Sequence, residues 1–229
     1  MNRFNYPYDL NINLTDIQID LAEQVIKKDL TEKPENIAGV DVSFAENNTA
    51  VAAAVLLDLK TLNIVEKSTR KVELDFPYIP GYLGFRESGA MVSVLKQLKT
   101  SPDMIMVNGH GILHPRGFGL ASQVGLLMDK PTIGLAKRLT MGKYKIKDIK
   151  SLEGKQKSFK LIKNGKEIVG AYIERYYVSI GHKISLNEAI KQAKAVSIYK
   201  TPEPIRQAHI LATEAFKDYI KKKIDFENN

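Results

Sequence analysis

The sequence of 229 residues contains no cysteine and no tryptophan. Without thiols the chain can form no disulfide bond and no cysteine-ligated zinc or iron–sulfur site, which fits a reducing compartment. No apolar run approaches the ~20 residues that a membrane-spanning helix needs. The first seven residues are polar and lack the hydrophobic stretch of a signal peptide. These absences predict a soluble, cytoplasmic protein.

The sequence also lacks internal repeats, low-complexity segments and Pro/Gly/Ser-rich linkers, so one domain over residues 1–229 is the simplest interpretation. Nothing in it demands more than a monomer. The formal net charge is +8, and the isoelectric point is near 9.4. A basic balance favours polyanionic partners, because phosphate neutralisation by Lys and Arg releases counterions.

Hydrophobic patterning predicts an α/β fold. Three strand-like runs follow one another at 37–44, 50–59 and 64–74. Only short turns separate them, so they must form an antiparallel meander. A short strand at 104–107, a helix at 120–128 and a strand at 132–136 then predict a parallel pair. Further strands are expected at 168–173 and 176–180. Helices are expected at 16–28, 87–99, 185–196 and 205–223.

Two polar residues interrupt apolar strands. Asp41 lies within the first strand, and burying its charge is costly unless it is paired or bound to a metal. The alternative is an Asp at a strand edge that faces solvent. Asn108 follows the apolar run 104–107, and the alternative here is an ordinary turn residue, because Asn-Gly favours turns. Glu87 is expected to begin a helix, where an acidic residue also complements the helix dipole.

The loop at 109–119 contains four glycines, two histidines, one arginine and one proline. It is poorly suited to core packing and well suited to close approach of a substrate. A dinucleotide-binding fingerprint is excluded, because its third glycine would fall at His114. A zinc site formed by His110 and His114 is disfavoured, because Gly111 and Pro115 argue against the helix that would align them.

The segment 76–87 (FPYIPGYLGFRE) contains two prolines, Pro77 and Pro80, which stiffen the backbone around its aromatic residues. A stiff apolar tip can act as a wedge between bases, and the alternative is a loop packed on the core. The runs Lys143-x-Lys145-x-Lys147 and 221–223 are typical of solvated faces. His182 and His209 are expected to have structural hydrogen-bonding roles.

Taken together and in this order, the segments resemble the endonuclease V family. The resembling motifs are IAGVDVSF (37–44), FPYIPGYLGFRE (76–87), VNGHGILHPRGFGLASQVGL (107–126), PTIGLAK (131–137), GHKIS (181–185) and TPEPIRQAH (201–209). The resemblance implies a ribonuclease H-like fold with a mixed sheet flanked by helices. It also implies a DNA repair endonuclease that recognises deoxyinosine and cleaves the second phosphodiester on its 3′ side, with Mg²⁺ or with Mn²⁺ as a substitute. DNA containing deoxyinosine, or RNA containing inosine, is then the expected partner.

Position by position, the resemblance implies metal ligation by Asp41, Glu87 and the residue at 108. It implies catalytic roles for His114 and Lys137, and Tyr78 matches the wedge that fills the space left by a flipped base. Contacts to nucleic acid or to the base are expected from the loop residues Tyr78, Pro80, Gly81, Gly109, Gly111 and Arg116.

The sequence departs from the family pattern at two positions. Asn108 stands where the family has Asp, and Gln123 stands where it usually has His. An amide can offer a carbonyl oxygen to a metal, but it removes one negative charge, so reduced or abolished cleavage with retained binding is expected. Asp103 and Asp129 lie at the far ends of the expected strand and helix, so neither is expected to replace the missing carboxylate at position 108. A non-catalytic inosine-binding module and an unrelated nuclease on the same fold are the alternatives.

Overall fold

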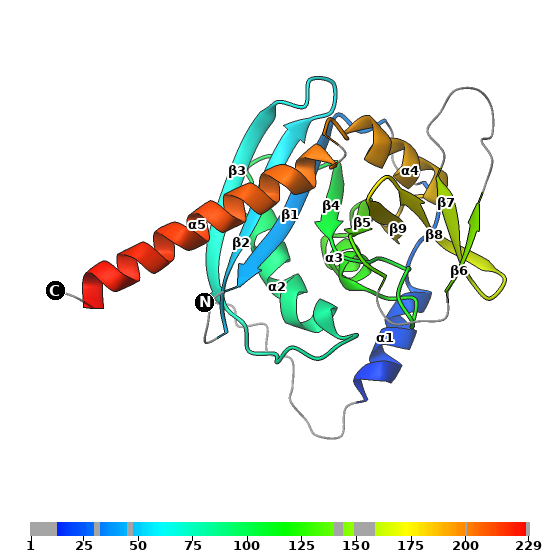
Figure 1. Cartoon of the computed structure of the whole chain (residues 1–229), viewed down its shortest axis with the longest axis horizontal. Coiled ribbons are helices and arrows are strands. Elements are labelled where there is room, and N and C mark those ends of the chain that lie inside the picture. The colour runs from blue at the N-terminus through cyan, green and yellow to red at the C-terminus, as the bar shows by residue number, and fades with distance from the viewer. Residues whose placement is uncertain are drawn as a thin grey trace.

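A computed structural model describes residues 13–29, 33–44, 48–139, 144–148, 159–199 and 201–227. Residues 1–7 and Lys143 lie outside these ranges, and the side chains of residues 144–148 and 222–227 are not described. Within these ranges, nine strands form one mixed sheet in the order β3-β2-β1-β4-β5-β9-β8-β7-β6 (Figure 1).

The strands are β1 (Asn36–Phe44), β2 (Thr49–Asp58), β3 (Ile64–Glu73), β4 (Met104–Asn108), β5 (Thr132–Ala136), β6 (Tyr144–Asp148), β7 (Lys160–Asn164), β8 (Glu167–Ile173) and β9 (Tyr176–His182). The helices are α1 (Leu14–Glu23), α2 (Leu83–Leu95), α3 (Leu120–Met128), α4 (Leu186–Ala195) and α5 (Glu203–Glu227).

The predicted meander and parallel pair are confirmed. β1, β2 and β3 form an antiparallel meander, and β4 and β5 run parallel. β1 also runs parallel to β4, a pairing that was not predicted. β6 and β7, which pair antiparallel with each other at the edge beyond β8, were not predicted either. Both strands have five residues, of which two are lysine, so each gives only a short apolar signal.

Helices cover both faces of the sheet, as predicted. Successive side chains of β1 point to opposite faces of the sheet and belong to two hydrophobic cores. Ile37 lies in one core with residues of α4 and α5, whereas Ala38 and Val40 lie in the other with residues of α2 and α3. In Figure 1, α5 crosses β1 and β2 on the near face and continues beyond the sheet. Among the described helices, none is both long enough and apolar enough to cross a membrane.

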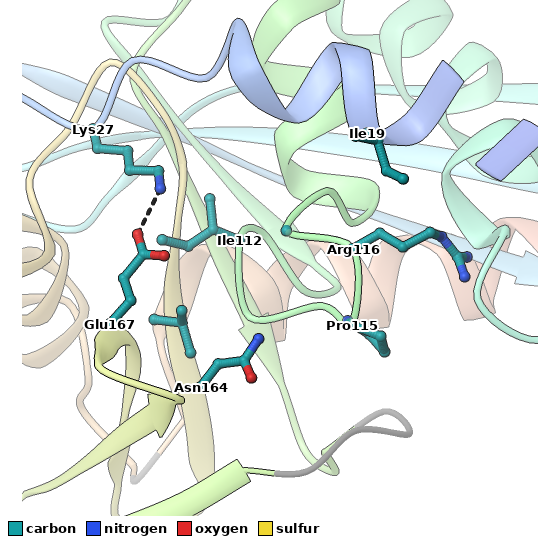
Figure 2. A pocket seen from close by; sticks show the side chains of 9 residues that line it. Ile19, Lys27, Ile112, Pro115, Arg116, Asn164 and Glu167 are labelled. Carbon is teal, nitrogen blue, oxygen red and sulfur yellow. Dashed lines mark hydrogen bonds and ion pairs between the residues drawn. The ribbon is translucent and has the colours of Figure 1, made fainter. Parts of the chain in front are cut away.

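The first helix differs in bounds and phase from the prediction. It begins at Leu14, with Asn13 capping the amide of Thr15, and it ends at Glu23 rather than 28. Gln18 is its buried residue, with 1% of its surface exposed, whereas Ile19 is 46% exposed at the rim of a pocket (Figure 2). The helix therefore buries a polar side chain and exposes an apolar one.

The second helix begins earlier than expected. α2 starts at Leu83, with Tyr82 at its N-cap, so Glu87 lies in the second turn. Interaction with the helix dipole is confined to the first turn. The alternative role of Glu87 as a first-turn acidic residue is therefore wrong, and its burial needs another explanation.

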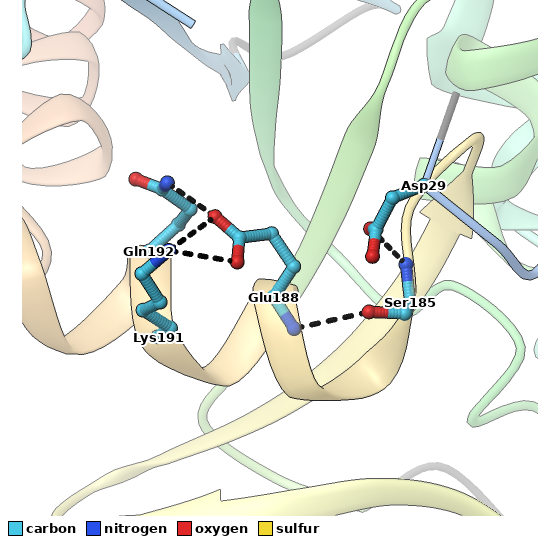
Figure 3. A network of polar contacts seen from close by, with 5 residues as sticks. All are labelled: Asp29, Ser185, Glu188, Lys191 and Gln192. Carbon is cyan, nitrogen blue, oxygen red and sulfur yellow. Dashed lines mark hydrogen bonds and ion pairs between the residues drawn. The ribbon is translucent and has the colours of Figure 1, made fainter. Parts of the chain in front are cut away.

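Ser185 caps α4, but the capping box that the pattern Ser185-x-x-Glu188 favours is only half formed. Its Oγ accepts a hydrogen bond from the amide of Glu188 at 3.2 Å. The carboxylate of Glu188 does not return to Ser185 and instead accepts hydrogen bonds from Lys191 and Gln192 (Figure 3). Asp29 takes its place and accepts from the Ser185 amide at 2.7 Å. This bond fixes the segment after α1 to the start of α4.

The contact between β1 and α5 depends on a glycine. A Cβ at Gly39 would lie 2.0 Å from the carbonyl oxygen of Pro204. We expect Gly39→Ala to lower the free energy of unfolding by at least about 2 kcal/mol, because backbone must move to admit the methyl group. Gly89→Ala is the matched control in α2. No atom lies within 4 Å of a Cβ there, so a gain of about 0.5–1 kcal/mol is expected. Equal effects of the two substitutions in urea unfolding would contradict this account.

Candidate active site

The parallel pairing of β1 with β4 builds the centre of the site. Val40 is in register with Val107, so the next residues, Asp41 and Asn108, lie side by side where β4 ends, while β1 continues to Phe44. Functional groups gather at such strand ends in α/β sheets. Asp103, by contrast, lies before β4 and binds the amides of Glu35 and Asn36 at the opposite end. It cannot replace a carboxylate at position 108.

Asp41 is buried, with 5% of its surface exposed, and both of its oxygens are engaged. Asn108 donates its Nδ2 hydrogen to Oδ1 at 3.0 Å. His209 Nδ1 lies 2.8 Å from Oδ2 and donates to it, because an ionised carboxylate can only accept. A solvent-facing Asp41 and a simple turn role for Asn108 are therefore both wrong.

His209 is a site residue that sequence reasoning missed. A structural hydrogen bond was expected, and the bond it forms is to the central carboxylate. Its side chain is 59% exposed, so the imidazole borders solvent as well as Asp41. Only its position at the end of the 201–209 motif pointed to it, because its partner is 168 residues away in the chain.

Glu87 enters the site from α2, with 6% of its surface exposed. Burial, together with the nearby negative charge of Asp41, raises its pKa to about 8, while Arg86 opposes the shift. The contribution of Asp41 indicates that the two carboxyl groups are near enough to interact. Strongly perturbed pKa values of this kind are typical of functional sites.

The cluster has two carboxylates rather than three. Across the described part of the chain, no group of three or more Asp, Glu, His or Cys side chains is arranged to hold a metal ion. The third position is occupied by the amide of Asn108, which at present donates to Asp41. The partly positive amide hydrogen of Asn108 offsets some of the negative charge on Asp41 Oδ1, as a cation would.

Lys137 extends the site along the sheet. Leu135 of β5 is in register with Asn108, and Lys137 is exposed directly after this strand. His110 fixes this segment, because its Nε2 lies 2.8 Å from the carbonyl oxygen of Arg138. The predicted lysine therefore follows a strand that adjoins the carboxylates, on the same end of the sheet.

The 76–82 loop presents an exposed tip. Tyr78 is 69% exposed and Ile79 is 38% exposed, and Pro80 is also exposed. A backbone hydrogen bond from the Tyr82 amide to the Ile79 carbonyl, 3.0 Å long, closes the turn behind them. The tip is not packed on the core, so the packed-loop alternative is wrong.

The base of this loop is held by a polar network around the Gly81 carbonyl. This oxygen accepts hydrogen bonds from Gln18 Nε2 at 3.1 Å and from the Arg116 guanidinium at 2.6 Å. Arg116 Nε also donates to Gln18 Oε1 at 2.5 Å. Its guanidinium stacks 4.5 Å from the Tyr82 ring centroid, and the Tyr82 hydroxyl bonds to Thr15. Arg116 therefore braces the loop from inside the protein.

His114 belongs to the same support. It is 5% exposed, its Nδ1 accepts from the Arg116 amide at 3.3 Å, and it hydrogen-bonds to the Gly81 backbone. Burial, together with the charges of Arg116 and His110, lowers its pKa to about 4, while the hydrogen bond to Gly81 opposes the shift. The hydrogen bonds of this imidazole thus lie within the protein, to Arg116 and Gly81.

Two glycines of the 109–119 loop make close contacts within the protein. A Cβ at Gly111 would lie 1.9 Å from the Ile180 carbonyl, and its amide donates to Ser179 Oγ at 2.9 Å. The Gly109 amide donates to the Val107 carbonyl at 2.9 Å. The two glycines therefore allow the loop to pack against α3 and β9.

A separate pocket of ≈ 360 Å³ lies between α1, the 112–117 loop and the β7–β8 turn (Figure 2). Apolar side chains of α1, the loop and β8 line its wall, and Lys27 and Glu167 form an ion pair of 2.6 Å at its edge. None of its lining residues belongs to the carboxylate cluster.

Comparison with known proteins agrees with this geometry. A family model described as Endonuclease V matches residues 19–210. Endonuclease V of Dictyoglomus thermophilum is 38% identical over 218 residues, which cover 92% of this chain and 90% of that protein. Endonuclease V of Protochlamydia amoebophila is 42% identical over 213 residues, which cover 89% and 88%.

Solved structures give the same result. The catalytic domain of human endonuclease V is similar with a TM-score of 0.82 and 28% identity, over 94% of this chain and 99% of that one. Ciona intestinalis endonuclease V, in complex with a 24mer DNA containing an inosine followed by a ribo-adenosine, has a TM-score of 0.78 and 27% identity, over 90% and 97%. The fold is therefore ribonuclease H-like, as predicted. The chain belongs to the endonuclease V family, whose members are nucleases.

The opposed pKa shifts of Glu87 and His114 predict an unusual dependence of stability on pH. The folded pKa of Glu87 is raised from 4.5 to about 8, so folding retains a proton and stability falls as pH rises across that interval. The pKa of His114 is lowered from 6.5 to about 4, so its contribution rises between those values. Without divalent cations, we expect the contributions of Glu87 and His114 to stability nearly to cancel up to about pH 6.5. From pH 6.5 to 8 the free energy of unfolding should then fall by up to about 1.4 kcal/mol per pH unit.

Urea unfolding with a chelator across this pH range measures the effect. Glu87→Gln should remove the fall above pH 6.5, whereas Glu214→Gln on the exposed surface of α5 should leave it unchanged. An unaltered slope in Glu87→Gln would show that Glu87 is not the titrating group.

The brace around Gly81 predicts a local effect of Arg116. Arg116→Gln removes the charged hydrogen bond to the Gly81 carbonyl, and a bond of this kind contributes about 1.5–3 kcal/mol. We expect amide hydrogen exchange in residues 78–82 to quicken by about 10-fold or more, with little change in the central strands. Arg70→Gln, on the exposed edge strand β3, is the control. Unchanged exchange in 78–82 would mean that the loop does not depend on Arg116.

Proposed function

We propose that this chain recognises deoxyinosine in DNA, and that its site can hydrolyse the second phosphodiester 3′ to the lesion once position 108 carries aspartate. The cluster of Asp41, Glu87 and Asn108 is the observation that carries the proposal. As it stands, the chain binds this substrate and cleaves it weakly or not at all. The complex of the Ciona relative with DNA containing inosine supports the choice of substrate.

Recognition rests on the braced loop. Reading a lesion base requires its removal from the stack, at a cost of a few kcal/mol. An apolar side chain that enters the gap offsets this cost. Tyr78, with Ile79 and Pro80 beside it, offers such a tip on a turn whose base is fixed by Gln18 and Arg116.

The donor set fits Mg²⁺, which takes oxygen ligands at about 2.0–2.1 Å and binds through one or two carboxylates plus substrate phosphate. Asp41 and Glu87 would hold it, and the raised pKa of Glu87 is the observation that favours an added cation. A bound Mg²⁺ or Mn²⁺ supplies an acidified water and neutralises developing charge. Asn108 can turn its carbonyl oxygen toward the ion only by giving up its hydrogen bond to Asp41.

The remaining residues of the site are not metal ligands in this proposal. His209 holds Asp41 Oδ2 and fixes the carboxylate in one orientation. Lys137 is exposed beyond β5, where its ammonium group can neutralise phosphate oxygens of the nucleic-acid substrate. His114 and Arg116 position the wedge loop rather than the reacting atoms.

Two other activities remain candidates, each with its own observation. The hydrogen bond from Asn108 to Asp41 satisfies the carboxylate internally, which favours a non-catalytic inosine-binding module. The ribo-adenosine that follows the inosine in the Ciona complex favours an inosine-specific ribonuclease.

The decisive change is Asn108→Asp. Outer-sphere partners of metal ligands already affect affinity or activity by about 10–100-fold, so a restored direct ligand should raise cleavage by at least about 100-fold. The assay uses labelled duplexes with one deoxyinosine, and strands with one riboinosine, with Mg²⁺ and then Mn²⁺. Asn108→Ala is the control, because it removes the amide hydrogen bond without adding a carboxylate.

Each outcome distinguishes the candidates. Cleavage by Asn108→Asp alone, with inosine binding by both proteins, supports the proposal, and preference for the riboinosine strand would favour the ribonuclease. Inosine binding without cleavage by either protein supports the binding module. Equal cleavage by the unmodified chain and Asn108→Asp would overturn the account of position 108.

A further inference from the structure

Phe44 is an exposed aromatic residue at the last position of β1, outside both the carboxylate cluster and the loop that carries Tyr78. The residue is 45% exposed, although burial of a phenyl ring is favourable. It also ends the motif IAGVDVSF, and neither the cluster nor the wedge loop gives it a role. Its position relative to the cluster decides what the ring can contact.

The overhang of β1 places Phe44 beside the candidate active site. β4 ends at Asn108, next to Asp41, whereas β1 continues for three more residues to Phe44. A strand rises by about 3.3 Å per residue, so the backbone of Phe44 lies about 10 Å beyond Asp41. Side chains alternate along the strand, so Phe44 shares the face of Val42, which lies in one hydrophobic core with residues of α2. Glu87 enters the cluster from the same helix.

Arg86 connects the ring to the cluster. Its guanidinium lies 5.7 Å from the centroid of the Phe44 ring, within the range of a cation–π contact. The guanidinium also donates hydrogen bonds to the Phe76 carbonyl and to Asn48 Oδ1, the latter at 3.3 Å, so its position over the ring is fixed. Glu87, the next residue of α2, carries a buried carboxyl group of the cluster. Consecutive residues of α2 therefore contact the phenyl ring and the cluster.

The exposed part of the ring is suited to a planar partner. Arg86 lies over the ring on one side, and the exposure of Phe44 leaves room for a second flat group. Every nucleobase has a π-face, and proteins that bind single strands stack successive bases on aromatic side chains in this way. A base within an intact duplex is covered by its neighbours, so only an unpaired or displaced base can make such a contact.

We propose that Phe44 is a stacking platform for an unpaired nucleobase of the substrate strand, beside the phosphodiester that the cluster would cleave. This proposal rests on the proposed function, since it takes the substrate to be a nucleic acid. The contact is with the face of a base, so it adds affinity without adding preference for inosine. It also favours a substrate that is single-stranded beside the scissile bond, because a paired base would first have to leave the duplex.

Alanine substitution tests the contribution of the ring to binding. Phe44→Ala should lower affinity for a single-stranded oligonucleotide by about 5- to 150-fold, the range for loss of one base–aromatic stack. The loss should be smaller for a duplex of the same sequence, and Phe44→Tyr should retain most of the affinity. Ile64→Ala is the matched control, because Ile64 is also 45% exposed. It lies on β3 opposite Leu57, at the end of the meander where β1 begins.

Binding is measured by fluorescence anisotropy with single strands and duplexes that carry one deoxyinosine or none, each with Mg²⁺ and with a chelator. Equal losses in Phe44→Ala and Ile64→Ala, or no loss in either, would overturn the stacking platform. If Phe44→Ala alone loses affinity while no protein prefers inosine, the platform stands and the proposed substrate fails. If the proteins prefer inosine but Phe44→Ala binds as tightly as the unmodified chain, the proposed function stands and the platform fails. Absence of binding to all of these oligonucleotides would overturn both.

A second measurement covers the case in which Phe44→Ala is misfolded. Because the chain has no tryptophan, Phe44→Trp and Ile64→Trp each create a unique fluorophore and keep a large apolar side chain. A base that stacks on the indole ring quenches its fluorescence. Addition of a single strand should therefore lower the emission from position 44 and leave that from position 64 nearly unchanged. Equal quenching at the two positions, or none at position 44, would overturn the platform.

Discussion

Asp41 is held between two hydrogen-bond donors at the junction of two parallel strands, with almost none of its surface exposed. A buried carboxylate is costly unless it is paired, and here an amide on one side and an imidazole on the other share that task. The pairing of β1 with β4 supplies Asn108, and the packing of α5 on β1 supplies His209. The charge of Asp41 also helps to raise the pKa of Glu87, which comes from α2. The site is thus formed where β1 and β4 of the sheet, α5 and α2 come together.

The wedge loop depends on a different part of the chain. Gln18 of α1 reaches the carbonyls of both Gly81 and Phe118, so one buried amide joins two loops that are far apart in sequence. Arg116 completes the connection from the second loop. The carboxylate cluster and the exposed tip therefore rest on separate supports, the cluster on β1, β4 and α2 and the tip on α1. A defect in one support can leave the other intact.

Much of the architecture was predictable because it follows local patterns. The meander, the parallel pair of β4 and β5 and the cap of α4 all have short-range signals. Motifs shared with the family located Glu87 and Tyr78. The parallel pairing of β1 with β4, which brings Asp41 beside Asn108, joins segments that are distant in the sequence and was not predicted. The supports of the site were not predictable either, because Gln18 and His209 act through partners 63 to 168 residues away. β6 and β7 were not predicted because both strands are short and two of the five residues in each are lysine.

The order of residues Asn108 and Gly109 has a chemical consequence of its own. An asparagine followed by glycine deamidates readily, because the glycine nitrogen attacks the side-chain carbonyl carbon, ammonia leaves, and water opens the ring to aspartate or isoaspartate. In the fold, the Gly109 amide donates to the Val107 carbonyl and the Asn108 side chain is held by Asp41, which restrains that attack. Unfolding removes both restraints. Ageing of a denatured chain would then create, without any change in the gene, a third carboxylate beside Asp41 and Glu87.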